Sequence, residues 1–129
     1  MPASTRFVNS DLAPQTEGNY AQAVEITDAT RWLYISGQIP VDRDGHTPTA
    51  FEDQCRLVWS NLIAQLHAAN MDIQNLVKVT IFLSDRSYAV ANREIRLEML
   101  GSTQPALSCF ITGIFDVDWL LEIEAVAAS

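Results

Sequence analysis

The sequence predicts an α+β fold in which a mixed sheet of five or six strands carries two helices on one face. Segments with alternating or β-branched character are typical of strands, and they fall at residues 6–9, 20–27, 31–36, 76–84, 107–112 and 119–127. Two longer segments with 3.6-residue apolar spacing, after residue 49 and over 87–100, indicate amphipathic helices. Two helices can cover only one face of such a sheet. No repeat or linker appears, so we expect one domain over residues 1–129.

The N-terminal third predicts strands joined by short turns. Residues 20–27 alternate, and residues 31–36 are rich in aromatic and β-branched side chains. A turn at 28–30 would pair these two strands as a hairpin, and residues 6–9 are a weaker candidate for a short first strand. The glycines and prolines between Gly37 and Pro48 are typical of a loop.

The first helix has a start signal, an apolar stripe and a stop signal. Thr49 and Glu52 have the spacing of a capping box. Asn70 is a plausible left-handed residue just beyond the last turn. The stripe between them comprises Phe51, Cys55, Val58, Trp59, Leu62, Ile63 and Leu66. These signals predict a helix that buries one face.

The second half of the chain predicts a strand, a helix and two further strands. In the strand 76–84, Val77, Val79, Ile81 and Leu83 share one face. Gly101 would end the second helix, and Gly113 lies between the last two strands. The other sheet face carries Phe82, Phe110, Leu120 and Val126, which are too apolar to remain in water. We therefore expect a homo-oligomer.

Composition excludes several classes of function. A net charge of −8, with scattered arginines and one lysine, disfavours nucleic acid as a partner. No apolar run reaches membrane-spanning length and no secretory leader is visible, so we expect a cytoplasmic protein without a membrane partner. Cys55 and Cys109 are far apart, and His46 and His67 lack ligand spacing, so no metal site is expected.

Glu122 and Glu124 are the first candidates for chemistry. In a strand of period two they project to the same face, while their apolar neighbours project to the other. Carboxylates on an apolar strand cost desolvation energy unless they are paired or hydrogen-bonded. Two interpretations stay open: a general acid or base, and a pair of structural carboxylates bonded to backbone N–H groups or arginines.

Four ordered motifs resemble the RidA/YjgF family of reactive-intermediate deaminases over almost the whole chain. They are ISGQIP at 35–40, VKVTIFL at 77–83, PALSC at 105–109 and LEIEA at 121–125. The resemblance implies a chorismate-mutase-like fold that trimerises into a barrel, with helices outside and ligand clefts between subunits. It also implies hydrolysis of small imines and enamines without a cofactor or metal. Other members of the family are named ribonucleases or translation inhibitors.

The resemblance assigns roles residue by residue. It implies that Glu122 activates water as the catalytic residue. The implied substrate-binding residues are Tyr20, Ser36, Gly37, Asn92, Leu107 and Cys109. One position departs from the family pattern, because Leu107 stands where the family carries the arginine that grips the substrate carboxylate.

Leu107 changes the expected substrate. An arginine forms a planar, bidentate pair with a carboxylate, which leucine cannot replace. Loss of one partner from a buried charged pair weakens binding by a factor of about 30 to several thousand. The pocket is therefore expected to bind imino acids poorly, unless another arginine such as Arg31 or Arg93 supplies the anchor. Two functions remain: an imine or enamine hydrolase with an altered substrate, and a non-catalytic trimer that binds a small metabolite at its subunit interfaces.

Overall fold

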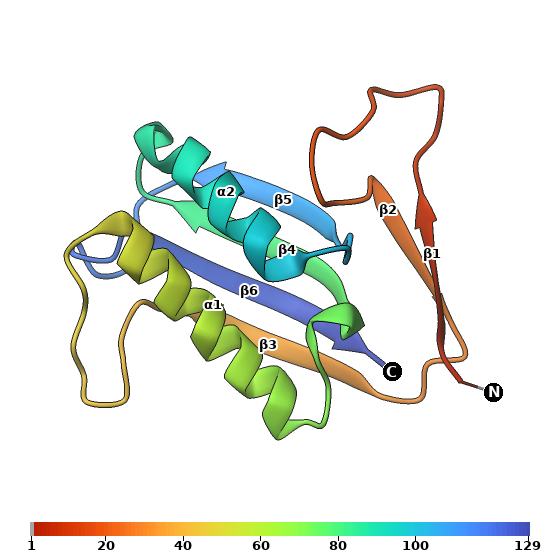
Figure 1. Cartoon of the computed structure of the whole chain (residues 1–129), viewed down its shortest axis with the longest axis horizontal. Coiled ribbons are helices and arrows are strands. Elements are labelled where there is room, and N and C mark those ends of the chain that lie inside the picture. Colours follow the sequence, from red (N-terminus) through yellow and green to blue (C-terminus); the bar gives the residue numbers. More distant parts are fainter. Residues whose placement is uncertain (1) are drawn as a thin grey trace.

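Two helices pack on one face of a four-stranded mixed sheet in the computed structural model, which describes residues 2–129 (Figure 1). The strand order is β3-β6-β4-β5; β4 and β5 are parallel, and the other pairs are antiparallel. The elements of this layer are β3 (Trp32–Gln38), α1 (Phe51–Ala68), β4 (Leu76–Leu83), α2 (Ala89–Leu100), β5 (Ala106–Ile111) and β6 (Leu121–Ala128). The expected α+β arrangement is confirmed.

The first two strands form a separate sheet, which corrects the predicted hairpin. β1 (Ser4–Val8) and β2 (Ala23–Thr27) pair with each other, and β3 pairs with β6 instead of β2. The chain turns away at Asp28, where φ is +60°. The N–H groups of Thr30 and Arg31 then donate to the carbonyl of Ser129, at 2.9 and 3.0 Å. These bonds attach β3 to the C-terminal end of β6, so the main sheet has four strands rather than five or six. A single bridge between Ala21 and Ala106 links the N-terminal segment to β5.

Helix α1 provides the largest share of the core, but its predicted N-terminal cap is wrong. The N-cap residue is Ala50, and no side chain caps the helix, because Thr49 lies one residue too early. The predicted stripe is buried except for Ile63, which is half-buried, and Cys55, Val58, Trp59, Leu62 and Leu66 are fully covered. Asn70 has the expected left-handed conformation, with φ at +56°.

Strand β4 lies in the middle of the core. Val79, Ile81 and Leu83 are fully buried under the helices, as the alternation predicts. Val77 departs from the pattern and is only half-buried, whereas Leu76 is buried. The pairing with β6 shifts register between Leu76 and Lys78, and this irregularity moves Leu76 to the core side.

Helix α2 begins two residues later than predicted. A 3₁₀ turn, η2 (Arg86–Tyr88), precedes it, and the Asp85 side chain accepts from the N–H of Ser87 at 2.8 Å. Gly101 ends the helix with φ at +58°, as predicted. Another 3₁₀ turn, η1 (Ile73–Asn75), leads from α1 into β4. The face of α2 towards the sheet buries Asn92 and Arg96 beside Ile95.

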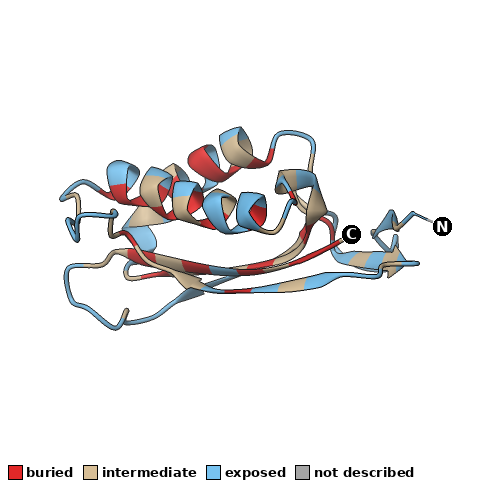
Figure 2. Cartoon of the chain, turned by 90° about the horizontal axis from the view of Figure 1, so that it is seen from below, coloured by how far each residue is buried: buried red, intermediate tan, exposed pale blue. Residues whose placement is uncertain are grey.

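The face of the sheet opposite the helices is uncovered (Figure 2). Large apolar side chains on it are strongly exposed: Trp32 by 50%, Tyr34 by 78% and Phe110 by 53%. This is the apolar face that the sequence predicts. Its burial against a further copy remains a prediction.

Candidate functional site

Glu122 projects from the start of β6 onto the uncovered face. Its neighbours Leu121 and Ile123 are fully buried on the helix side, so alternation directs Glu122 the other way, where it is half-buried. Phe82 lies opposite it on β4 and stacks on Phe110, with ring centroids 5.9 Å apart. Apolar rings therefore flank the carboxylate on this face.

A buried amide holds the segment that leads into Glu122. Gln54 of α1 is 1% exposed. Its Nε2 donates to the carbonyls of Pro48 and Asp118, at 2.8 and 3.0 Å, and its Oε1 accepts from the N–H of Leu120 at 2.8 Å. Because the bonds to Asp118 and Leu120 end on backbone groups, they fix the loop before β6 to helix α1.

Gly37 lies directly against the Glu122 carboxylate. A Cβ on Gly37 would be only 2.7 Å from Cδ and 3.0 Å from Cγ of Glu122, and would overlap Oε2. A register shift in β3 between Ile35 and Gln38 shapes this approach, and Ser36 within it is exposed. Glycine is needed here for close approach to the acid.

A hollow of about 230 Å³ opens beside this carboxylate. Its lining consists of Phe82, Thr112, Gly113, Ile114, Phe115 and Glu122. Within residues 2–129, no hydrogen bond or ion pair engages the Glu122 side chain. A free carboxylate beside an apolar wall can take a proton from a bound water.

A second group of predicted residues lies on the helix side of β5. Leu107 pairs with Val79 and Cys109 with Ile81, and both partners face the helices, so Leu107 and Cys109 face the helices as well. Asn92 of α2 is 2% exposed on this side. Leu107 is partly buried against the core, and Cys109 is exposed near the sheet edge.

Tyr20 belongs to this second group, because its ring lies 5.9 Å from the Arg96 guanidinium carbon. The predicted site residues thus fall into two groups on opposite sides of the sheet. Ser36, Gly37 and Glu122 form one, and the second comprises Tyr20, Asn92, Leu107 and Cys109. One chain does not bring the two groups together.

Sequence reasoning missed Arg96 as a candidate residue. The spacing of Arg93 and Arg96 on one helical face is visible in the sequence. The sequence does not show that Arg96 is buried, with only 5% of it exposed. An arginine buried this deeply is uncommon without a charged partner.

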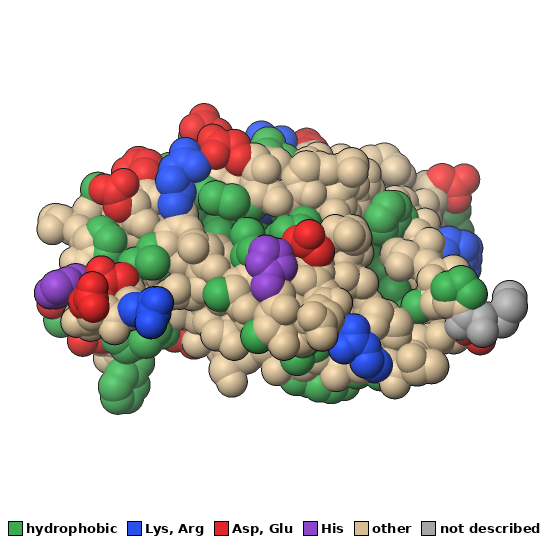
Figure 3. Space-filling model, turned by 60° about the horizontal axis from the view of Figure 1, so that its bottom comes forward, with side chains coloured by type: hydrophobic (Ala, Val, Ile, Leu, Met, Phe, Trp, Pro, Cys, Tyr) green, Lys and Arg blue, Asp and Glu red, His purple; other side chains and the backbone are tan. Residues whose placement is uncertain are grey.

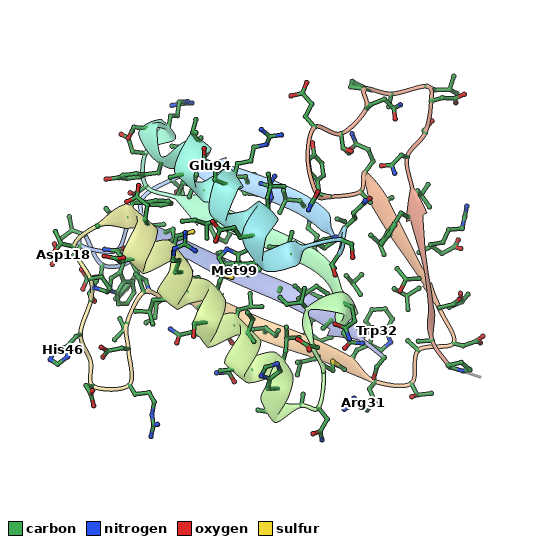
Figure 4. The ribbon with its side chains drawn as sticks, in the orientation of Figure 1. Arg31, Trp32, His46, Glu94, Met99 and Asp118 are labelled. Atoms are coloured by element: carbon green, nitrogen blue, oxygen red, sulfur yellow. The ribbon has the colours of Figure 1, made fainter. Side chains whose placement is uncertain are left out.

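Arg31 and His46 lie beyond opposite ends of β3 (Figure 4). Arg31, considered above as a substitute anchor, donates to the Ala69 carbonyl at 2.8 Å and to Ser129 Oγ at 3.2 Å. His46 lies on the exposed loop after β3. Its N–H and that of Asp44 donate to the Asp42 carboxylate, each at 2.9 Å. The carboxylates of Asp42 and Asp44 and the ring of His46 lie close enough together to hold a cation. The backbone bonds to Asp42 already account for the shape of the loop.

The two cysteines should differ sharply in reactivity. Cys55 is fully buried, and desolvation raises the pKa of its thiol to about 12. Partial burial also raises the pKa of Cys109, but nearby Arg96 opposes that shift and the side chain is exposed. In the native protein we expect iodoacetamide to alkylate Cys109 and spare Cys55, with peptide mass spectrometry as the measurement. Equal labelling of both thiols would contradict this arrangement.

The surface carries no continuous basic stripe in the view of Figure 3, where the basic side chains lie apart from one another among acidic ones. In the part of the chain that the structure describes, none of the helices is both long and apolar enough to span a bilayer.

Together the fold and the Glu122 pocket define a small α+β protein with a half-buried, unpaired carboxylate on its uncovered sheet face. Comparison with known families places it further: the chain belongs to the Endoribonuclease L-PSP family, whose model matches residues 10–129. The resemblance to RidA/YjgF proteins is thereby confirmed, and relatives of this chain carry reactive-intermediate deaminase names.

Relatives align over nearly the full chain. A RutC family protein of Pyrococcus horikoshii is 35% identical over 120 residues, covering 92% of this chain and 93% of the relative. TdcF of Escherichia coli, whose name proposes a reactive intermediate deaminase, is 30% identical over 126 residues, covering 95% of each.

Solved structures show the same fold. YyfB of the Rid protein family from Yersinia pestis superposes with a TM-score of 0.84 at 23% identity, covering 97% of this chain and 98% of that one. The structure of E. coli TdcF with bound serine has a TM-score of 0.72 at 30% identity, covering 96% and 98%.

Proposed function

We propose that this protein hydrolyses small imines, enamines or related C–N compounds with water activated by Glu122. The observation that carries the proposal is the free Glu122 carboxylate, half-buried among apolar side chains and seated against Gly37. Family membership supports it, since TdcF is a relative over almost the whole chain.

The reaction needs one proton acceptor and one water. The Glu122 carboxylate takes a proton from water while the water oxygen bonds to the imine carbon and the C=N electron pair moves to nitrogen. Protons from Glu122 and the new hydroxyl then reach the nitrogen, the C–N bond breaks, and ammonia leaves a carbonyl product. An enamine first takes a proton on carbon to become the imine. No metal or cofactor enters this scheme.

The complete site in this proposal is a cleft between subunits of a cytoplasmic homotrimer. The two groups of residues lie on opposite sides of one sheet, so a cleft that holds both needs more than one copy. The exposed Trp32, Tyr34 and Phe110 supply an apolar surface for such contacts. The small-molecule substrate would then lie at the subunit interface, and neither nucleic acid nor a membrane is a partner.

The proposed substrate differs from the imino acids that the family resemblance implies, because Leu107 carries no charge. A leucine wall favours a substrate that is neutral where it contacts residue 107, since an unpaired carboxylate against an apolar side chain loses its hydration without compensation. The proposal therefore favours uncharged imines over 2-iminopropanoate and similar imino acids.

Exchanging Leu107 for arginine tests the altered substrate. Ammonia release is measured from freshly generated 2-iminopropanoate and from an uncharged imine, propan-2-imine, each above its spontaneous hydrolysis. We expect the wild type to accelerate hydrolysis of the uncharged imine and to act weakly on the acid. Leu107→Arg should raise activity on the acid by about 30-fold or more, because a bidentate pair is restored.

Two results would count against the proposal. If the wild type hydrolysed 2-iminopropanoate as fast as propan-2-imine, Leu107 would not select against charged substrates. A monomeric mass in solution by light scattering would remove the shared cleft.

A further inference from the structure

The backbone just before Glu122 is bonded on both of its sides. The N–H of Leu120 donates to Gln54 Oε1 of α1 at 2.8 Å, and the carbonyl of Leu120 accepts from the N–H of Ser84 at 2.9 Å. Gln54 is 1% exposed, and its amide nitrogen donates to two further backbone carbonyls. Because these polar groups are satisfied away from water, a shift at the start of β6 would break bonds to α1 and β4 together.

A second amide of α1 fixes the segment that follows Gly37. Asn61 Nδ2 donates to the carbonyls of Ile39 and Val41, each at 3.0 Å. Pro40, between these two residues, is fully buried. The register of β3 against β6 shifts around Gly37, so regular sheet pairing does not fix this glycine. Its position therefore depends on the anchored segment after it.

The two amides belong to one face of one helix. Gln54 and Asn61 are seven residues apart, which is close to two turns of α1. The helix packs over both β3 and β6 (Figure 1). It thus holds the two segments that meet where Gly37 lies against the Glu122 carboxylate. An apolar side chain at either position would fill space in the core, but it would bond neither segment.

We propose that Gln54 and Asn61 are positioning residues that set where the Glu122 carboxylate lies relative to Gly37. The inference deepens the proposed hydrolysis and rests on it. Neither amide touches the reacting atoms, because each acts through the backbone that it holds. A displacement of about 1 Å in a catalytic group can lower a rate about 100-fold, so bonds on both sides of this contact control the rate of the reaction.

Gln54→Met tests the Glu122 side of the contact, because methionine keeps the length of the side chain and removes all three bonds. We expect kcat for ammonia release from propan-2-imine to fall by about 10- to 100-fold, with KM within about threefold of wild type. The assay is run well below the midpoint of thermal unfolding of each variant. In a Glu122→Gln background the same change should cost little further activity, since the proton acceptor is already lost. A purely structural role would lower the midpoint without this pattern.

Asn61→Ala tests the Gly37 side, and it carries the test alone if Gln54→Met does not fold. Asn61 is half-buried, so its loss disturbs the core less than a change at Gln54. We expect kcat to fall by about 10-fold. Gln65→Met is the matched control, because Gln65 is an exposed residue of the same helix. Its activity should stay within about twofold of wild type.

A measurement that needs no turnover separates this inference from the proposed function. The nuclear Overhauser effect between Gly37 Hα and Glu122 Hγ reports their contact, and it should weaken by about twofold or more in Gln54→Met and Asn61→Ala but not in Gln65→Met. If the wild type hydrolyses no imine, the proposed function fails and this contact alone decides the positioning role. An unchanged contact in both variants would overturn the inference. So would full additivity between Gln54→Met and Glu122→Gln.

Discussion

Glu122→Gln should lower the rate of imine hydrolysis by about 100- to 10,000-fold, the range typical of a lost general base. Glutamine has nearly the same shape, so it keeps the contact with Gly37 and the packing against Phe82. It cannot accept a proton from water. The loss should therefore appear in kcat for ammonia release, with little change in the temperature of unfolding.

Glu124→Gln is the matched control for this experiment. Glu124 lies two residues further along β6, on the same face, but it is exposed and faces Thr80. Its substitution removes the same charge from the same strand without touching the pocket, so activity should stay within about twofold of wild type. Equal losses in the two variants would show that the net charge of the face matters rather than a proton transfer at Glu122.

Local patterning predicted the elements of the fold well where one face of an element is buried. The alternation of apolar residues in β4 and the apolar stripe of α1 both arise because these side chains pack in the same core. The helix ends at Asn70 and Gly101 were predictable because few residues adopt a positive φ easily.

The errors arose where non-local bonds decide the outcome. The segments 20–27 and 31–36 have the spacing of a hairpin, but the bonds between Arg31 and Ser129 place β3 against the C-terminal strand. Ser129 lies nearly one hundred positions from Arg31, yet its bonds decide the pairing of β3. A local sequence pattern contains no information about so distant a partner. The false capping box at Thr49 has a similar cause, because the helix begins where Phe51 enters the core.

The candidate site was predictable in its residue types but not in its arrangement. Alternation correctly put Glu122 on the face opposite Leu121 and Ile123. The division of the predicted residues between two sides of the sheet depends on strand order, which periodicity does not reveal. Arg96 was hidden for a related reason, since a charged residue in a helix is ordinarily assigned to the solvent face.

Gly37→Ala should reduce hydrolysis by about 100-fold while leaving the fold intact. The new Cβ would overlap the Glu122 carboxylate, which is the far end of a flexible side chain and can swing away. Stability should therefore change little, but a displacement of about 1 Å in a catalytic group is enough for a loss of this size. The measurement pairs kcat for ammonia release with the midpoint of thermal unfolding.

Gly113→Ala is the matched control, because Gly113 lines the same hollow and its added Cβ would meet no atom within 4 Å. It should keep wild-type activity. If the steric argument is right, Gly37→Ala should cost little further activity in a Glu122→Gln background, since both changes disable the same proton acceptor and their effects are not additive. Full additivity in the double variant would instead show that Gly37 serves the substrate directly, through its backbone, and that the close contact with Glu122 is incidental to the reaction.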